Sequence, residues 1–595
     1  MLKSTLLFPA AILASMASAQ TTPPQAPAQG LVPTPVAIPT LATPLTVIFT
    51  NIASSPLSEV PGLPGVRFDG FGRPNLSPNG LNYVITAAAD LPTAESDLLI
   101  ANGVVILRES EAPSFLAPGN TIGNFDQGAS INDAGQVAFS VDTTAATTED
   151  DVIARYDGPG SFSLIAQENS PVVGGPVGWI YDSLNTSVIT NSGVVGYESD
   201  SIDGTAGGTS DDNAMFMGPM PFAQKGVDIP AGQLTGNMDP WDDFDTADLF
   251  INASGTRYIL QGDVDSSSTL NDDVVVVDGT IVVQEGFPLI GGDPTQIVDS
   301  SGIAAVFMSG GGDWTAEGDF DGSNVDWVIY NGDLIAREGD PIHPGSTETW
   351  GTPAFIASTC NSVGDFIVGG DTDMSDATRD QVIVLNGERV VMREGDPVDL
   401  DGNGLFDDGL FVNIFGTDDF RLTDDLQLFF TATVREAGST TTVGSIFGVL
   451  DLRDSVGSTI CAGQPNSTGG ESRLGAMGSS TVADNNLTLE VEGLPSGQFG
   501  FFVTSLGTGF VANPGGSAGD LCIADPVLGR YSNMVQTTSA TGSVSQTLDL
   551  TMIPLPIGFT AVVAGETRYW QFWHRDTVAG VAGSNFSTAL GVTFE

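Results

Sequence analysis

Basic side chains are scarce in this chain of 595 residues, where 18 lysines and arginines stand against 73 aspartates and glutamates. The formal net charge of -55 at pH 7 repels the phosphates of nucleic acids and the headgroups of anionic membranes. We therefore expect no nucleic acid as a partner. A charge of this size suits a salty or cation-rich medium, in which screening weakens self-repulsion, and solubility alone explains it equally well.

Histidine is nearly absent, and the familiar catalytic motifs are missing. The two histidines are His343, in a loop, and His574, in an aromatic run near the C-terminus. The sequence has no histidine-rich metal spacing, phosphate-binding loop, dinucleotide fingerprint or nucleophile elbow. With so few basic residues, we also expect no cluster of arginines around a catalytic centre. His343 is interpreted as a solvated loop residue, with a general base as the alternative.

Long apolar runs are confined to the N-terminus. Residues 1–19 have the pattern of an export signal, with Lys3, an apolar run from Leu6 to Leu13, and an A-x-A cleavage site at residues 17–19. No later run reaches the roughly 18 apolar residues that span a bilayer. We predict a secreted or cell-surface protein without a membrane span. Residues 20–42, rich in proline and threonine, predict an extended linker.

One short unit recurs along most of the chain, and Val325–Pro341, VDWVIYNGDLIAREGDP, is its clearest copy. Two apolar runs flank Asn331-Gly332, and the second run ends in Glu338-Gly-Asp-Pro. Asn-Gly between two apolar runs is a strong hairpin signal, because a type I′ turn needs positive φ at both central residues. The unit therefore predicts a β-hairpin.

The repeat has a regular period. A proline closes the second strand of each repeat, at Pro56, Pro113, Pro171, Pro230, Pro288, Pro341 and Pro397. The spacings between successive prolines are 57, 58, 59, 58, 53 and 56 residues. A second hairpin in each repeat turns at an N-x-x-G pattern, which we place at Gly80, Gly135, Gly193, Gly255, Gly302, Gly364 and, in the same place, Leu426. Four antiparallel strands repeated seven times predict a seven-bladed β-propeller over residues 43–453.

A solenoid is the main alternative to a propeller. The repeat region begins with a second-strand mark, at Val47–Pro56, and ends with a first-strand mark, at Ile446–Leu450. A closed ring requires such a split hairpin if one blade is completed by both ends of the chain, whereas a solenoid needs polar caps. We therefore expect the strands at the two ends of this region to pair.

Alternating strand directions place the tight turns on one face of the ring and the E-G-D-P segments, with long acidic loops, on the other.

Asp399-Leu-Asp401-Gly-Asn403-Gly, followed by Asp407, has the spacing of oxygen ligands in a calcium loop. It lacks the bidentate glutamate of that loop, so a metal-free turn is the alternative. A weaker calcium candidate comprises Asp319, Asp321 and Asp326.

After residue 453 the period stops. Residues 454–595 alternate apolar runs with Gly, Pro, Ser and Asn turns, which predicts a β-sandwich. Cys461 and Cys522 both lie here, and in an exported protein we expect a disulfide between them. Cys360 is left over and is predicted to be a buried free thiol.

An aromatic run, residues 569–576, suggests a platform for sugars, whose faces stack on aromatic rings. Trp570 and Trp573 are the candidate ligand-binding residues. They face opposite sides of a strand, because side chains alternate, so at least one belongs to the core. A purely structural role for both is the alternative.

The C-terminal part resembles a module of large secreted proteins from environmental bacteria. The resemblance rests on three groups of residues: Cys461-x-Gly463-x-Pro465-Asn466-Ser467-Thr468-Gly469, Gly565-Glu566-Thr567, and Gln571-x-Trp573-x-Arg575-Asp576. The E-G-D-P repeats resemble propeller-type repeats of the same proteins. The resemblance implies the architecture and export, and it implies no activity.

Together these features predict an exported, non-catalytic binding protein with an acidic propeller face that binds calcium. Its expected partner is a polysaccharide or a component of the cell surface or matrix. The alternative is a polysaccharide-degrading lyase or glycosidase with its site in the propeller mouth, where such folds place ligands. An arginine–carboxylate cluster on the axis would favour the alternative.

Overall fold

The computed structural model describes residues 45–125, 128–321, 325–401, 408–453, 456–485, 487–523, 527–539, 542–578 and 581–594. The predicted signal and linker, residues 1–19 and 20–42, lie outside these ranges. The described part of the chain is built of strands, and its only helical pieces are five 3-10 turns: Pro56–Ser58, Thr93–Glu95, Gly208–Ser210, Val482–Asp484 and Pro514–Gly516. The all-β prediction is therefore confirmed. No helix in the described ranges is long and apolar enough to cross a membrane.

The described residues between Leu45 and Asp451 form seven antiparallel sheets. The first two contain β2 (Phe68–Phe71), β3 (Asn75–Leu76), β4 (Tyr83–Ala89), β5 (Asp97–Ala101) and β6 (Val104–Arg108), then β7 (Ile122–Asn124), β8 (Ser130–Ile131), β9 (Val137–Thr143), β10 (Val152–Gly158) and β11 (Ser161–Gln167). The next two contain β12 (Ile180–Ile189), β13 (Val195–Asp203), β14 (Ala214–Met217) and β15 (Met220–Gln224), then β16 (Trp241–Ile251), β17 (Tyr258–Val264), β18 (Asp273–Val277) and β19 (Thr280–Gln284).

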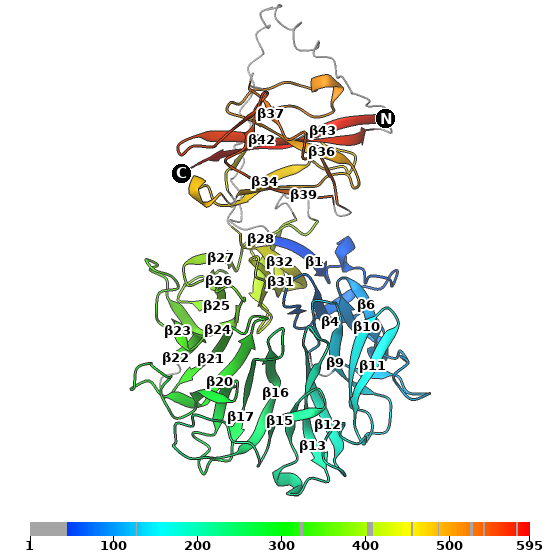
Figure 1. Ribbon diagram of the computed structural model, residues 1–595, viewed down its shortest axis with the longest axis vertical. Coiled ribbons are helices and arrows are strands. Elements are labelled where there is room, and N and C mark those ends of the chain that lie inside the picture. The colour runs from blue at the N-terminus through cyan, green and yellow to red at the C-terminus, as the bar shows by residue number, and fades with distance from the viewer. Residues whose placement is uncertain are drawn as a thin grey trace, which may run out of the picture. The chain divides into compact units, whose positions relative to one another are not determined.

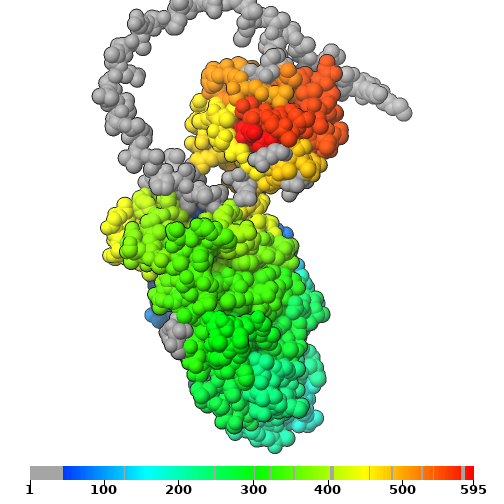
Figure 2. All heavy atoms as spheres, turned by 90° about the vertical axis from the view of Figure 1, so that its left-hand side faces the viewer, coloured from blue at the N-terminus to red at the C-terminus, as the bar shows by residue number. Residues whose placement is uncertain are grey.

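The remaining three sheets follow the same order. The fifth and sixth contain β20 (Val298–Met308), β21 (Trp314–Phe320), β22 (Val325–Tyr330) and β23 (Asp333–Arg337), then β24 (Trp350–Cys360), β25 (Phe366–Thr372), β26 (Gln381–Leu385) and β27 (Arg389–Arg393). The seventh contains β28 (Pro397–Val398), β29 (Leu410–Phe415), β30 (Arg421–Leu422), β31 (Gln427–Glu436) and β32 (Thr442–Asp451), with β1 (Leu45–Thr50) at its edge. Figure 1 shows the sheets in succession from blue to green, and the green sheets form a continuous surface in Figure 2.

The two ends of the repeat region pair as expected. Strand β1 runs antiparallel to β32, with Val47 opposite Gly448 and Phe49 opposite Phe447. In Figure 1, β1 (blue) lies beside β31 and β32 although nearly 400 residues separate them in the chain. The hydroxyl of Thr50 donates to the carbonyl of Ser445, which is 395 positions away. The seventh sheet is therefore completed by the N-terminal strand.

The turns follow their sequence signals with one exception. Asn331 and Gly332 have φ of 51° and 92°, as the type I′ hairpin requires. The N-x-x-G turn that we placed at Gly302 is wrong, because Gly302 lies inside β20 and the chain turns at Gly312, with φ of 99°. This turn begins at Ser309 and lacks the asparagine of the N-x-x-G pattern, as do the turns that begin at Ser77, Thr190 and Thr423.

The described residues from Ser458 onward form two larger sheets and a small hairpin. The first sheet contains β33 (Ser458–Cys461), β36 (Phe499–Ser505), β37 (Gly529–Arg530), β38 (Gln536–Thr537), β42 (Thr567–Val578) and β43 (Val581–Thr593). The second contains β34 (Arg473–Gly478), β35 (Leu487–Glu492) and β39 (Val544–Leu548), and the hairpin pairs β40 (Ile553–Pro554) with β41 (Phe559–Thr560). Leu474 and Leu489 of the second sheet share one apolar core with Trp570 and Phe572 of the first.

The cysteines are arranged as predicted. Cys461 and Cys522 form a disulfide that joins residues 61 positions apart. Cys360 is a free, buried thiol at the end of β24.

Candidate functional site

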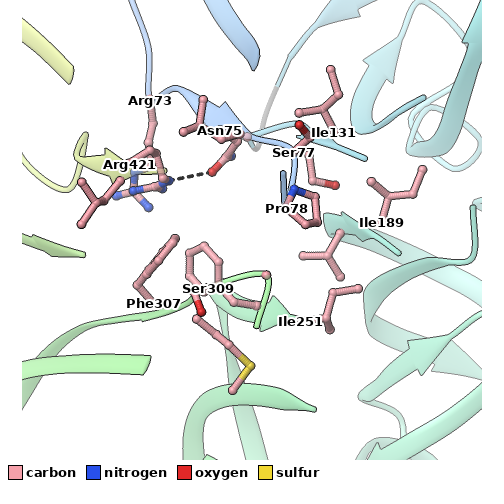
Figure 3. Close-up of a pocket in the computed structure, with 18 of the residues that line it drawn as sticks. Arg73, Asn75, Ser77, Pro78, Ile131, Ile189, Ile251, Phe307, Ser309 and Arg421 are labelled. Atoms are coloured by element: carbon pink, nitrogen blue, oxygen red, sulfur yellow. Dashed lines mark hydrogen bonds between the residues drawn. The ribbon is translucent and has the colours of Figure 1, made fainter. Parts of the chain in front are cut away.

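An axial cavity of about 330 Å³ takes residues from each of the seven sheets (Figure 3). At least one strand of every sheet contributes to its wall: β3 and β4, β8, β12, β16, β20, β24 and β30. Phe250, Phe307 and Ile131 are among its apolar lining residues, and Ser77, Ser309 and Thr423 are among its polar ones. The cavity therefore offers both an aromatic surface and hydrogen-bonding groups to a ligand.

Arg421 is the most deeply buried charge at this cavity, with 5% of its surface exposed. Its guanidinium donates to Asn75 Oδ1 at 2.9 Å and to the carbonyl oxygens of Asp418 and Phe420 at 3.0 and 2.7 Å. The same group lies 5.1 Å from the ring centre of Phe307, a cation–π contact. Figure 3 shows the hydrogen bond to Asn75 and the ring of Phe307 beside it. These contacts fix Arg421 in one position.

Several carboxyl groups and a second arginine lie near Arg421. Arg73 forms an ion pair with Asp418 at 3.0 Å, and Asp419 accepts a hydrogen bond from Thr431. Burial lowers the pKa of Arg421 to about 9 and raises the pKa of Glu317 to about 7. The expectation that no arginines gather at the centre is therefore wrong: the scarcity of basic residues in the whole chain did not prevent two of them from meeting here.

The rim of the cavity is held by hydrogen bonds between the turns of neighbouring sheets. The side chain of Asn132 donates to the carbonyl of Thr190 at 3.0 Å, and Asn361 donates to that of Thr423 at 3.2 Å. The backbone N–H of Ser362 donates to Asp424 at 2.7 Å. The asparagines of the N-x-x-G turns thus join one sheet to the next, which gives the cavity a rigid entrance.

Acidic groups gather at the opposite ends of the same strands. Six sheets share one backbone hydrogen bond at this end. The N–H of the residue that follows the last strand donates, at 2.9 to 3.1 Å, to the carbonyl oxygen of a residue near the start of the third strand. The donors and acceptors are Glu109 to Asp97, Glu168 to Asp151, Lys225 to Asn213, Glu285 to Asp273, Glu338 to Asp326 and Glu394 to Gln381. These residues occupy one equivalent position in each sheet, and five of the six are glutamates.

Two groups of acidic residues are compact enough to bind a cation. Each residue of the group Asp150, Asp151 and Glu168 has a carboxylate oxygen within 4.8 Å of the others, and the same holds for Asp399, Asp401 and Asp408. The sequence predicted Asp399 and Asp401 and missed Asp408. Carboxylate oxygens are the ligands that calcium prefers.

The other predicted calcium ligands fall into two sets. Asn403 and Asp407 lie outside the described residues. Asp319 and Asp326 are register partners on β21 and β22, and burial together with Asp326 raises the pKa of Asp319 to about 7. Asp321 is an exposed residue directly after β21, and this set stays a prediction.

The aromatic run at residues 569–576 lies on β42. Trp570 has 0% of its surface exposed, so the prediction that it binds sugar is wrong, because its face of the strand packs in the core. Trp573 is half-buried, with its ring 5.1 Å from that of Phe501 and 5.4 Å from the Arg575 guanidinium. Its assignment to ligand binding stays a prediction.

Neither histidine lies at the axial cavity. His343 is in a loop after β23, where its Nδ1 lies 3.2 Å from the carbonyl oxygen of Pro344. His574 is buried beside Ser472, and burial lowers its pKa. Sequence reasoning also missed Arg73 and Arg421, because each sits in a segment without a motif.

Comparisons with known proteins assign no family. The sequence matches no family model, and no curated protein matches it. Among solved structures, a prolyl endopeptidase shares 10% identity over 72% of this chain and 56% of its own, with a TM-score of 0.32. An exo-beta-1,3-galactanase from Phanerochaete chrysosporium shares 8% identity over 82% of this chain and 99% of its own, with a TM-score of 0.22. A sialidase from Trypanosoma rangeli shares 9% identity over 93% of this chain and 97% of its own, with a TM-score of 0.27.

Proposed function

We propose that residues 43–453 form a seven-bladed β-propeller closed by β1 and β32, and that residues 454–595 form a β-sandwich. Two observations support this: each of the seven sheets supplies a strand to the axial cavity, and the first strand completes the last sheet. The resemblance to secreted bacterial proteins agrees with this architecture and with export. The chain would then act outside the cytoplasm.

We propose further that the protein binds carbohydrate in the axial cavity and does not catalyse its turnover. The observation that carries this is the combination of Phe250 and Phe307 with hydroxyl and amide groups in one wall. Sugars present C–H faces to aromatic rings and hydroxyls to polar side chains. A volume of about 330 Å³ is at the low end of the roughly 300–1,000 Å³ of small-molecule sites. The cavity therefore fits a terminal sugar of a polysaccharide on a cell surface or in a matrix.

The charged groups at the cavity support binding over catalysis. Arg421 and Asp419 already have protein partners, and Arg73 is paired with Asp418. A general acid or base must reach the reacting group directly or through one water molecule. Charged groups that are already held by protein partners serve to position the cavity wall.

Calcium binding at the acidic loop completes this proposal. Asp399, Asp401 and Asp408 would supply three carboxylate ligands to one ion. An ion that binds only the folded state raises stability. We expect the melting temperature to fall on addition of a chelator at moderate salt, and a melting temperature that does not move would remove calcium from this loop.

The experiment that tests the main proposal is a glycan array with parallel turnover assays on every glycan that binds. We expect binding without release of product. The double variant Phe250→Ala/Phe307→Ala removes the aromatic wall, and its affinity should fall at least about tenfold, because stacking on aromatic rings contributes roughly 1 kcal/mol for each ring. Phe510→Ala, at an aromatic residue that is 68% exposed outside the repeat region, is the matched control. Equal loss of binding in both variants would contradict the proposal.

A polysaccharide-degrading enzyme is the second candidate. It is favoured by one observation: Arg73 and Arg421, which line the cavity, also line a small pocket that contains Asp418 and Glu317. Release of product from a bound glycan, lost in Glu317→Gln while binding persists, would establish this activity and overturn the non-catalytic proposal.

A further inference from the structure

Arginine predominates among the charged residues of the axial cavity. Of the charged residues that the structure describes, only Arg73, Arg421 and Asp424 line it. Asp424 is exposed at the rim, where it accepts a hydrogen bond from the backbone N–H of Ser362 at 2.7 Å. Figure 3 shows the two guanidinium groups together at one side of the cavity. In a chain with 18 basic residues, two of them therefore meet at one cavity.

The contacts that hold Arg421 use only part of its hydrogen-bonding capacity. A guanidinium carries five N–H donors. Arg421 uses its Nε on Asn75 and its Nη1 on the carbonyls of Asp418 and Phe420, and no described residue accepts a hydrogen bond from its Nη2. The side chain is buried, with 5% of the residue exposed, and a buried donor without an acceptor costs free energy. An acceptor that enters the cavity would remove this cost.

Arg73 presents free donors at the same cavity. Its Nη2 is paired with Asp418 at 3.0 Å, and among the residues that the structure describes none accepts a hydrogen bond from its Nε or Nη1. Burial, followed by the charge of Arg73, lowers the pKa of Arg421 to about 9, so both arginines are charged at neutral pH. Two like charges this close together favour an anion beside them.

The carboxyl groups near the two arginines are not part of the cavity wall. Asp418 and Glu317 line a separate small pocket, which Arg73 and Arg421 also line, and Asp419 lines neither. Burial raises the pKa of all three carboxyls, that of Glu317 to about 7. The described wall of the cavity therefore carries more positive than negative charge.

Two serine hydroxyls of the same cavity also lack a hydrogen-bond partner among the described residues. They are the Oγ atoms of Ser130, in β8, and Ser187, in β12. Ser187 is buried, with 4% of its surface exposed. A hydroxyl both donates and accepts, so these groups match the hydroxyls of a sugar. The cavity thus offers partners for hydroxyl groups in addition to its two arginines.

We propose that the sugar bound in the axial cavity carries a carboxylate, as uronic acids do, and that Arg73 and Arg421 bind this group. The inference rests on the proposed carbohydrate binding and narrows its ligand. The planar fork of a guanidinium matches the two oxygens of a carboxylate. The sugar ring and its hydroxyls would contact Phe307, Ser130 and Ser187. The net charge of -55 opposes an anion only at a distance, because salt screens charges more than about 10 Å apart.

The experiment is a calorimetric titration of the full-length mature protein near neutral pH and at moderate salt. The ligands are methyl glycosides of glucuronic, galacturonic and mannuronic acid, each compared with its neutral parent sugar. We expect at least one uronide to bind about tenfold or more tightly than its neutral parent, because hydrogen bonds to charged groups are stronger than neutral ones. The 6-sulfate of the same neutral sugar is the second anion. Equal or tighter binding of the sulfate would overturn the assignment to a carboxylate.

The variant Arg73→Gln tests the role of the arginines. We expect the ratio of uronide affinity to neutral-sugar affinity to fall at least about tenfold. Arg257→Gln is the matched control, because Arg257 is paired with Asp278 at 2.8 Å and its side chain is 39% exposed, against 34% for Arg73. Arg257 does not line the cavity, and its variant should keep the ratio of the parent protein.

The outcomes separate this inference from the proposed function. Equal affinity for uronides and neutral sugars overturns the inference and leaves carbohydrate binding in place. An equal fall of the ratio in both arginine variants does the same, and so does binding of neutral glycans alone. Absence of binding to every glycan of the array overturns both.

Discussion

Phe49, in the first described strand, lies against Phe447 in the last strand of the repeat region, with 6.3 Å between their ring centres. Phe49 also packs on Phe68 and Phe71 of the first sheet, at 4.9 and 6.4 Å. A single buried ring therefore joins the seventh sheet to the first at the seam where the two ends of the chain meet.

Truncation of this ring should weaken the whole repeat region. Phe49→Ala leaves a cavity at the seam, and we expect it to lower the free energy of unfolding by about 3–5 kcal/mol. Urea unfolding followed by tryptophan fluorescence measures the loss. Thr46→Ala, at an exposed residue of the same strand, is the control and should change stability by less than about 0.5 kcal/mol. Equal stability of the two variants would show that the seam does not hold the ring closed.

The acidic clusters predict a stability that falls as pH rises in the absence of calcium. Burial raises the pKa of Glu168 and Glu285 from 4.5 to about 7, and that of Glu394 to about 8. Between about pH 4.5 and pH 8 the folded protein retains protons that the unfolded chain has released. The contribution of these carboxyl groups to the free energy of unfolding is therefore present near pH 4.5 and lost near pH 8. Melting temperatures in chelator across this range measure the effect.

Calcium should flatten this dependence. The ion replaces the retained protons and favours the ionised carboxylates, so the melting temperature should change less with pH when calcium is present. A melting temperature in chelator that rises steadily from acidic to basic pH would contradict the assignment of these groups.

The disulfide predicts a third measurable effect. Cys461 and Cys522 close a loop of about 60 residues, since they are 61 positions apart. Such a link stabilises by about 4 kcal/mol, mainly by restricting the unfolded chain. Cys461→Ser/Cys522→Ser should therefore shift unfolding of the C-terminal part to lower urea and leave the transition of the repeat region in place. The double variant should also become insensitive to reductant, and a continued response to reductant would point to Cys360.

Much of the fold was predictable because its signals are local and repeated. Asn331-Gly332 and its counterparts specify hairpins through their positive φ, and the evenly spaced prolines count the repeats. The pairing of β1 with β32 followed from the order of these marks alone. The turn at Gly312, which lacks the asparagine on which the pattern depends, was missed.

The candidate site was far less predictable, because its residues meet only through the closed ring. Arg73 and Arg421 are separated by nearly 350 residues, and neither belongs to a motif. Asn75, which accepts a hydrogen bond from Arg421, lies 346 positions before it in the chain. The alternation of side chains in β42 showed that Trp570 and Trp573 face opposite ways but did not show which of them packs in the core.

The position of β1 at the edge of the seventh sheet also bears on how the chain folds. Its partner strand ends at Asp451, so β1 has no strand to join until some 400 later residues have been synthesised. Contacts of such long sequence separation form slowly. Pairing of β1 with β32 is therefore a late event in folding, and until it occurs the seventh sheet lacks its outermost strand.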